Sequence, residues 1–157
     1  MHTDFTPDRS RLVIPALAPL YSGLAGLSWL ALRAIAGIAL AVHGWPKIQD
    51  PFRNVGMVES LGFVPGVFWS PLLAGTEFFG GILIAIGLFT RPAAAGATIV
   101  LGVTAYFHWI VQGQGFAGAE KSLLWLAIAF FFVVRGGGFL SIDASLRRLG
   151  TDYVDLY

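Results

Sequence analysis

The chain has 157 residues, of which 56% are hydrophobic and only 12% are charged, and its formal net charge is +1. Water-soluble domains carry about 25% charged residues, so this composition indicates a membrane protein, and the small net charge gives no sign of a nucleic-acid partner. The absence of cysteine excludes a disulfide framework, thiol redox chemistry and cysteine-ligated clusters within the chain.

Four segments are long and apolar enough to cross a bilayer, which takes roughly 20 mostly apolar residues. We expect an all-α fold, a bundle of four transmembrane helices at about residues 22–45, 67–89, 92–111 and 119–136. They form one membrane domain, residues 22–140, between an N-terminal cytoplasmic or interfacial segment (1–21) and a cytoplasmic tail (141–157). The loop after the first helix contains "DPFRNVGMVESLG", which predicts a short surface helix between Pro51 and Gly62.

The segment before the first predicted helix has two interpretations. Pro15 and Pro19 interrupt helical hydrogen bonding, which favours an interfacial approach over residues 12–21. A signal peptide is the alternative, because Arg9 and Arg11 precede an apolar run and "ALA" at 16–18 resembles a cleavage box. The apolar run before that box is short for a signal peptide.

Lysine and arginine predict the orientation of the helices, because they are enriched on the cytoplasmic side. With both termini in the cytoplasm, three of these residues face outward: Lys47, Arg53 and Lys121. Six face inward: Arg9, Arg11, Arg91, Arg135, Arg147 and Arg148. We therefore expect a multi-pass protein of the cell inner membrane with both termini in the cytoplasm.

Two opposite charges lie within the predicted spans. Arg33 is fourteen residues before Lys47, about 21 Å along a helix. Glu77 is ten residues after Val67, about 15 Å from the same side. An unpaired charge in a span costs at least ~2.5 kcal/mol, so we expect an Arg33–Glu77 ion pair on adjacent helices. Three glycines of the second helix, with Gly37 of the first, would let the two backbones approach. The three are Gly75, Gly80 and Gly81.

A second polar set is expected near the outer boundary, where three helices bring His43, Lys47, His108 and Glu120 to a common depth. Each histidine alone is better explained as a hydrogen-bonded packing residue, whereas four convergent groups favour a polar pocket. A quinone headgroup suits this set, because histidine donates hydrogen bonds and moves protons near neutral pH. Haem b would use His43 and His108 as axial ligands, and a hard metal would need more carboxylates than Glu120. We predict no metal site, no catalytic residue and no cofactor of the chain's own.

Five stretches carry a family resemblance, in order: Arg33 with "HGWPK", "EFFGGILIAIGLFTRPAA", His108, "EKSLLWL" and "RGGGFLSID". They cover about Leu30 to Asp143, and the chain resembles the DoxX family of small four-helix membrane proteins. The most specific block surrounds Glu77, Gly80, Gly81, Gly87, Thr90 and Arg91. From the residues alone, "RGGGF" is also typical of a helix C-cap and exit turn.

The resemblance implies an integral membrane subunit associated with oxidoreductases. Some relatives resemble the membrane part of a thiosulfate:quinone oxidoreductase, and others belong with a membrane complex that includes a superoxide dismutase and a sulfurtransferase. The resemblance implies seven candidate functional positions: Arg33, His43, Lys47, Glu77, Arg91, His108 and Glu120. The expected partners are the lipid bilayer and other membrane or redox subunits, or further copies of the chain.

Three functions remain open on these grounds. The first is a quinone-interacting or anchoring subunit of an electron-transfer complex, with no self-contained catalytic site. The second is a structural accessory subunit that packs against a larger membrane complex. The third is a small transporter, for which one four-helix unit without broken helices or repeats is poorly suited.

The end of the chain, "ASLRRLGTDYVDLY" at 144–157, resembles a short phrase of aldo-keto reductases. Fourteen residues cannot supply a barrel or a nicotinamide pocket, so this likeness predicts no activity. As a tail the segment could dock a neighbouring subunit through Leu146, Leu149, Tyr153 and Leu156, which are spaced 3, 4 and 3 residues apart.

Overall fold

The computed structural model describes residues 12–150, and this part of the chain is helical without any strand. The long helices are α1 (Ala18–Gln49), α3 (Gly66–Ile86), α4 (Thr90–Tyr106) and α5 (Gly115–Arg135). The short elements are η2 (Pro15–Leu17), α2 (Val55–Ser60), the π-helical turn η3 (Phe107–Val111) and α6 (Ile142–Arg148). Four helices, with α4 and η3 counted as one, are long and apolar enough to cross a membrane. The predicted all-α, four-span fold is confirmed, whereas the orientation of the termini stays a prediction.

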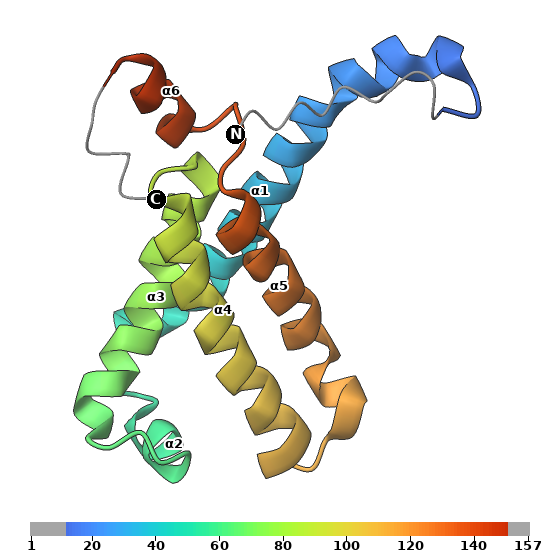
Figure 1. Ribbon diagram of the computed structural model, residues 1–157. Coiled ribbons are helices and arrows are strands. Elements are labelled where there is room, and N and C mark those ends of the chain that lie inside the picture. Colours follow the sequence, from blue (N-terminus) through green and yellow to red (C-terminus); the bar gives the residue numbers. More distant parts are fainter. Residues whose placement is uncertain (1–11, 151–157) are drawn as a thin grey trace.

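The long helices pack in the order α1, α3, α4, α5, with the closest association between α1 and α3 and between α4 and α5. Ala94 and Ala97 of α4 and Phe132 of α5 are completely buried at the centre. Helix α1 meets α5 near one end only, where Trp29 packs on Phe131 and Phe132. Figure 1 shows the first turns of α1 projecting beyond the other helices.

Helix α1 is longer than the predicted span of residues 22–45, because neither Pro19 nor Pro46 ends it. Pro19 lies in the first turn, where its missing N–H has no helical partner to lose. Pro46 lies inside the helix, which continues through it to Gln49. Residues 18–21, expected in an interfacial approach segment, are therefore part of the first spanning helix. The short surface helix predicted between Pro51 and Gly62 is confirmed as α2.

Glycines set the spacing between α1 and α3. A Cβ on Gly81 would lie 2.5 Å from the backbone nitrogen of Ala41, and one on Gly44 would lie 2.5 Å from the backbone nitrogen of Phe78. Gly37 likewise has the backbone of Ala85 where its Cβ would be. Small residues in this arrangement let two membrane helices touch through their backbones.

The prediction that Gly75 and Gly80 share this contact is wrong. A Cβ on Gly75 would meet only the Phe79 side chain, at 3.9 Å. A Cβ on Gly80 would meet the carbonyl oxygen of Ala93 on α4, at 3.8 Å. These two glycines lie on other faces of α3.

The contacts of α1 and α3 fix their register. Gly44 lies against Phe78 and Ala41 against Gly81, so Arg33 reaches the level of Gly87, where its guanidinium occupies the space beside that glycine. Helix α1 therefore ends partway along α3, and α2 covers the first turn of α3. There Glu59 Oε1 accepts a hydrogen bond from the Gly66 amide at 2.8 Å.

The bundle has two chemically different ends (Figure 1). At one end, termed the arginine end, the α3–α4 turn and the α5–α6 connection lie beside the middle part of α1, residues 26–33. Its charged residues are Arg33, Arg91, Arg135, Asp143, Arg147 and Arg148. At the other, termed the lysine end, lie the end of α1, α2, η3 and the start of α5. Its charged residues, counting Glu77 because Lys47 reaches it, are Lys47, Asp50, Arg53, Glu59, Glu77, Glu120 and Lys121.

Candidate functional site

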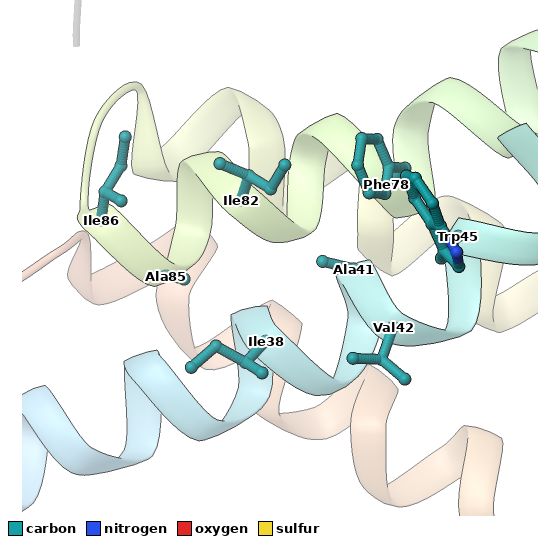
Figure 2. A pocket seen from close by; sticks show the side chains of 8 residues that line it. All are labelled: Ile38, Ala41, Val42, Trp45, Phe78, Ile82, Ala85 and Ile86. Carbon is teal, nitrogen blue, oxygen red and sulfur yellow. The ribbon is translucent and has the colours of Figure 1, made fainter.

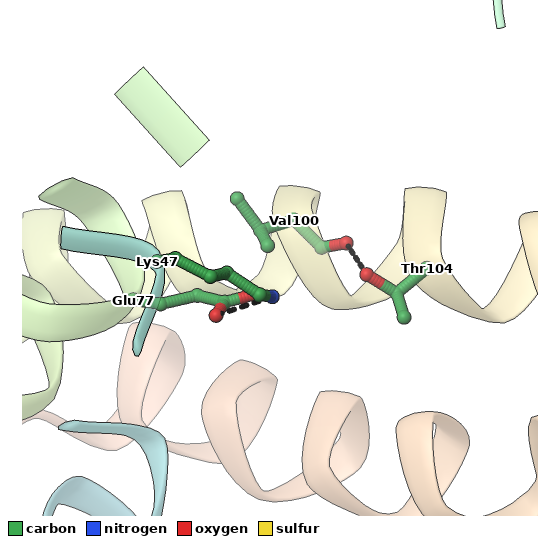
Figure 3. A network of polar contacts seen from close by, with 4 residues as sticks. All are labelled: Lys47, Glu77, Val100 and Thr104. Atoms are coloured by element: carbon green, nitrogen blue, oxygen red, sulfur yellow. Dashed lines mark hydrogen bonds and ion pairs between the residues drawn. The ribbon is translucent and has the colours of Figure 1, made fainter. Parts of the chain in front are cut away.

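An ion pair joins the first two spanning helices. The ammonium nitrogen of Lys47 donates to both carboxylate oxygens of Glu77, at 2.6 Å each. The Glu77 side chain is 5% exposed and the Lys47 side chain 28% exposed. Figure 3 shows this pair together with Val100 and Thr104 of α4. The Thr104 hydroxyl donates to the Val100 carbonyl oxygen at 2.8 Å.

The sequence explains why Lys47 can reach a carboxylate at the middle of α3. Side chains of a helix lean toward its N-terminus, so Lys47 leans back from the end of α1 toward the interior of the span. Gly44 lies one turn earlier and packs on the backbone of Glu77 and Phe78, which brings the two helices close at this level. Trp45 completes the contact on another face, with its ring 5.4 Å from that of Phe78.

Two of the sequence motifs therefore touch each other. "HGWPK", residues 43–47, supplies Gly44, Trp45 and Lys47, and "EFFGG", residues 77–81, supplies Glu77, Phe78 and Gly81. Sequence analysis placed these motifs on adjacent helices but did not place them in contact. The signal that could have linked them is the lysine one turn after a glycine.

The predicted ion pair between Arg33 and Glu77 is wrong. Ten residues of α3 separate Glu77 from Gly87, the residue beside the Arg33 guanidinium, which is about 15 Å along the helix. The expectation failed because it ended α1 near Gly44 and aligned Lys47 with the start of α3. In the structure α1 is longer and α3 extends past its end, so Lys47, and not Arg33, reaches the carboxylate.

Arg33 is instead bonded to backbone carbonyls of the α5–α6 connection. Its Nη1 donates to the Gly137 oxygen at 2.5 Å and its Nη2 to the Leu140 oxygen at 2.8 Å. The residue is 2% exposed, and Gly87, with φ of +74°, leaves the space that the guanidinium fills. Arg33 thus ties the first span to the chain that leaves the last span.

Asp143 makes a second tie at the arginine end, one that the sequence analysis did not identify. Its carboxylate accepts from the amides of Phe89 and Thr90, at 2.8 and 3.0 Å, and from the Thr90 hydroxyl at 2.8 Å. Thr90 begins α4 and Phe89, with φ of +47°, precedes it. A carboxylate from another element therefore caps α4, in the role usually taken by a local side chain.

Two further parts of the sequence motifs meet at these ties. "GLFTR" at 87–91 contributes Gly87, Phe89 and Thr90, and "RGGGFLSID" at 135–143 contributes Gly137, Leu140 and Asp143. The predicted C-cap is confirmed, since Gly136 ends α5 with φ of +73°. The Ser141 hydroxyl then accepts from the Ala144 amide and begins α6.

The other members of the predicted polar set remain apart from Lys47. His43 and Glu120 are exposed, and neither forms a hydrogen bond with Lys47 or with His108 in the described part of the chain. His108 lies in the π-helical turn, where its Nδ1 is 3.0 Å from Gln112 Oε1 and 3.2 Å from Gln114 Oε1. Gln114 Nε2 also donates to Gln112 Oε1 at 2.8 Å. The lysine end therefore holds two polar groups, the Lys47–Glu77 pair and a His108–glutamine group.

Two hollows of the surface lie away from these polar residues. A groove of about 390 Å³ between α1 and α3 is lined only by apolar side chains, with Trp45 and Phe78 at one end and Ile86 at the other (Figure 2). A second hollow of about 350 Å³ lies between α3 and α4, and Thr76 is its polar side chain. Both are open and apolar, so they suit hydrocarbon chains better than a polar headgroup.

These features define a small multi-pass helical membrane protein with a charged pair between its first two spans. The family model for DoxX matches residues 28–109, about half of the chain. Together with the relatives described next, this match shows that the chain belongs to the DoxX family.

Three curated proteins are similar over most of their length. A Bacillus subtilis protein named "Putative oxidoreductase CatD" is 31% identical over 114 residues, which cover 73% of this chain and 83% of that protein. An uncharacterized Haemophilus influenzae protein is 31% identical over 71% of this chain and 85% of its own length. The Escherichia coli inner membrane protein YqjF is 34% identical over 76% of this chain and 92% of its own length. No solved structure matches the chain.

Proposed function

We propose that this DoxX-family protein is an integral subunit of an oxidoreductase of the cell inner membrane, and that its lysine end receives the headgroup of a quinone. Two similarities support the setting: one relative is named as an oxidoreductase and another as an inner membrane protein. The observation that carries the proposal is the Lys47–Glu77 pair inside the spanning region. Ionisable groups at that depth are expensive to keep and mark functional sites by default.

The geometry of the pair suits a carbonyl ligand. A lysine ammonium has three donors, and Glu77 accepts two hydrogen bonds from it. The third donor is available to a quinone carbonyl oxygen. Because the Lys47 side chain is more exposed than that of Glu77, a ligand that approaches the pair meets the ammonium first.

The remaining groups of the lysine end can hold or move protons. A quinone, when bound, supplies the redox chemistry by taking up two electrons and two protons. The electrons would come from a partner subunit, since the proposal gives this chain only contacts and protons. His108 faces two amide oxygens through Nδ1, an arrangement that suits a proton on Nδ1 and leaves Nε2 for a ligand. His43 is exposed at the same end and can exchange protons with water or with the ligand.

The test uses a variant that removes the polar pair without leaving a lone charge. In Lys47→Leu/Glu77→Leu both partners become apolar, so the fold should persist. Binding is followed in nanodiscs by quenching of tryptophan fluorescence with a short-chain ubiquinone, because Trp45 is two residues from Lys47. We expect saturable quenching of the wild type and affinity weaker by about tenfold or more in the double variant, as for the loss of one or two charged hydrogen bonds.

A matched control is Lys121→Leu, which removes an exposed lysine from the same end of the bundle. It should bind the quinone as the wild type does. Equal affinity of the double variant and the wild type would overturn the quinone role of the pair.

A structural accessory subunit is the second candidate, and one observation favours it. Glu77 is almost fully buried at the tightest helix–helix contact of the protein, where an ion pair would also serve to hold α1 on α3. This alternative predicts that Lys47→Leu/Glu77→Leu still assembles with its native partners. The complex should then transfer electrons to quinone in native membranes at the wild-type rate. Loss of electron transfer with retained assembly would reject it.

A further inference from the structure

The arginine end holds an excess of positive charge. Five arginines and one aspartate make up its charged residues within the described range, whereas three basic and four acidic residues make up those of the lysine end. The excess at the arginine end is therefore four positive charges, against one negative charge at the lysine end. A difference of this size gives the two ends opposite electrostatic surfaces.

The single carboxylate of the arginine end is already occupied. Asp143 accepts three hydrogen bonds from Phe89 and Thr90. Arg33 is buried and bonded to two backbone carbonyls. Within residues 12–150, Asp143 is the one carboxylate at this end of the bundle.

Three guanidinium groups border one short loop, residues 136–139. The Arg91 side chain lies beside Gly136, within 3.4 Å of where a Cβ would stand. Arg135 lies over the Trp29 ring, 5.8 Å from its centroid, and Trp29 in turn lies against Gly138. Arg148 donates to the Phe139 carbonyl oxygen at 2.9 Å. The loop thus lies next to arginines from three helices, α4, α5 and α6.

Two of these guanidinium groups keep most of their donors available. Arg91 makes one long hydrogen bond, 3.4 Å to the Val134 carbonyl oxygen. Arg148 donates to two carbonyl oxygens, those of Ala144 and Phe139. A guanidinium has five N–H donors in a planar fork that suits phosphate oxygens, so both can bind a phosphate without giving up these contacts.

Apolar side chains surround the arginines. Phe139 is 56% exposed, Leu140 45% and Ile142 39%. In water these exposed side chains would be unfavourable, whereas at a bilayer boundary they enter the acyl region while the arginines stay among the headgroups. The combination matches the boundary of a charged membrane.

We propose that the loop 136–139 and its three arginines form a binding site for the phosphate headgroup of an anionic phospholipid. Arg91 and Arg148 hold the phosphate oxygens, Arg135 on Trp29 supplies charge beside them, and Phe139 contacts an acyl chain. The site lies at the opposite end of the bundle from the Lys47–Glu77 pair, so it is independent of the proposed quinone role.

The test is native mass spectrometry of the full chain released from a neutral detergent, titrated with phosphatidylglycerol or with phosphatidylcholine of the same acyl chains. The wild type should retain phosphatidylglycerol in preference. Arg91→Gln/Arg148→Gln should lose this preference, by roughly fivefold in affinity for each arginine removed. Arg91→Lys/Arg148→Lys keeps the charge and should keep most of the preference.

The matched control is Arg53→Gln/Lys121→Gln, which removes two basic residues from the lysine end. It should retain phosphatidylglycerol as the wild type does. Equal retention of the two lipids by the wild type would overturn the proposal, and so would an equal loss in the control variant. Displacement of the lipid by millimolar inorganic phosphate would assign the site to free phosphate instead.

Discussion

The two ends of the bundle hold their ionised residues in different ways. At the arginine end, Arg33 bonds to the carbonyl oxygens of Gly137 and Leu140, and Asp143 bonds to backbone amides at the start of α4. At the lysine end, Lys47 and Glu77 bond to each other. The bonds to the backbone hold connecting turns in place, whereas a pair of side chains joins two helices directly.

The two ends therefore differ in what their charged side chains hold together. The arginine end joins the middle of α1, the α3–α4 turn and the exit from the last span, which are far apart in sequence. The lysine end has a longer connection, residues 50–65 with α2 in it, and its buried carboxylate, Glu77, is paired with the Lys47 side chain. The predictions below test whether the two ends differ in this way, beginning with the largest expected effect.

Breaking the Lys47–Glu77 pair on one side should have the largest effect on stability. Lys47→Leu leaves the buried Glu77 carboxylate alone and should lower the free energy of unfolding by about 3–5 kcal/mol. Glu77→Leu should cost less, because Lys47 is partly exposed and can turn toward water. Lys47→Leu/Glu77→Leu should regain most of the loss, as measured by thermal or denaturant unfolding in detergent. A double variant as unstable as Lys47→Leu would argue against the pair.

Replacing Arg33 should also destabilise the protein, but independently of Glu77. Arg33→Met removes two charged hydrogen bonds to buried carbonyl oxygens and should cost about 3 kcal/mol. Hydrogen exchange should increase mainly in residues 136–143, which the guanidinium holds. Arg33→Met combined with Lys47→Leu/Glu77→Leu should show additive losses, since distant sites do not couple. Strong non-additivity would contradict the separation of the two ends.

Adding one methyl group to α3 should have opposite effects on two of its faces. Gly81→Ala places a Cβ 2.5 Å from the Ala41 backbone nitrogen, which forces α1 and α3 apart and should cost about 1–3 kcal/mol. Gly75→Ala is the matched control, because its Cβ would meet only Phe79 at 3.9 Å. It should be neutral or stabilising by about 0.5–1 kcal/mol, since alanine favours a helix over glycine. Both changes are compared by their unfolding midpoints, and equal effects would refute the close contact.

Removing the cap of α4 should have the smallest effect of this series. Asp143→Ala deprives the amides of Phe89 and Thr90 of their acceptor and should cost about 1 kcal/mol, as for other helix N-caps. Hydrogen exchange at the first turn of α4 should rise, while the lysine end keeps its protection. A uniform rise over all helices would show that Asp143 does more than cap α4.

The number of spans and the class of fold could be read from the sequence because they depend on local composition. Apolar runs of sufficient length, interrupted by Gly, Pro and charged residues, identify α3, α4 and α5 without any tertiary information. The same reasoning identified α2 in the loop after Pro51 and the C-cap at Gly136. The residues of the candidate site were also within reach: Lys47 and Glu77 were both singled out as ionisable groups in or near a span.

Which of these residues meet was decided only by the tertiary structure. Charge and depth suggested that Arg33 pairs with Glu77, but depth was measured from Lys47 and Val67, which were taken to lie at the same side of the membrane. The close packing of Gly37, Gly44 and Gly81 fixes the register of α1 against α3. In that register Lys47 pairs with Glu77. Arg33 instead donates to the carbonyl oxygens of Gly137 and Leu140. Composition determines that a segment spans the membrane, because burial in lipid is a local property of each segment. The partner of a charge depends on how two helices slide against each other, and that depends on contacts between residues far apart in the chain.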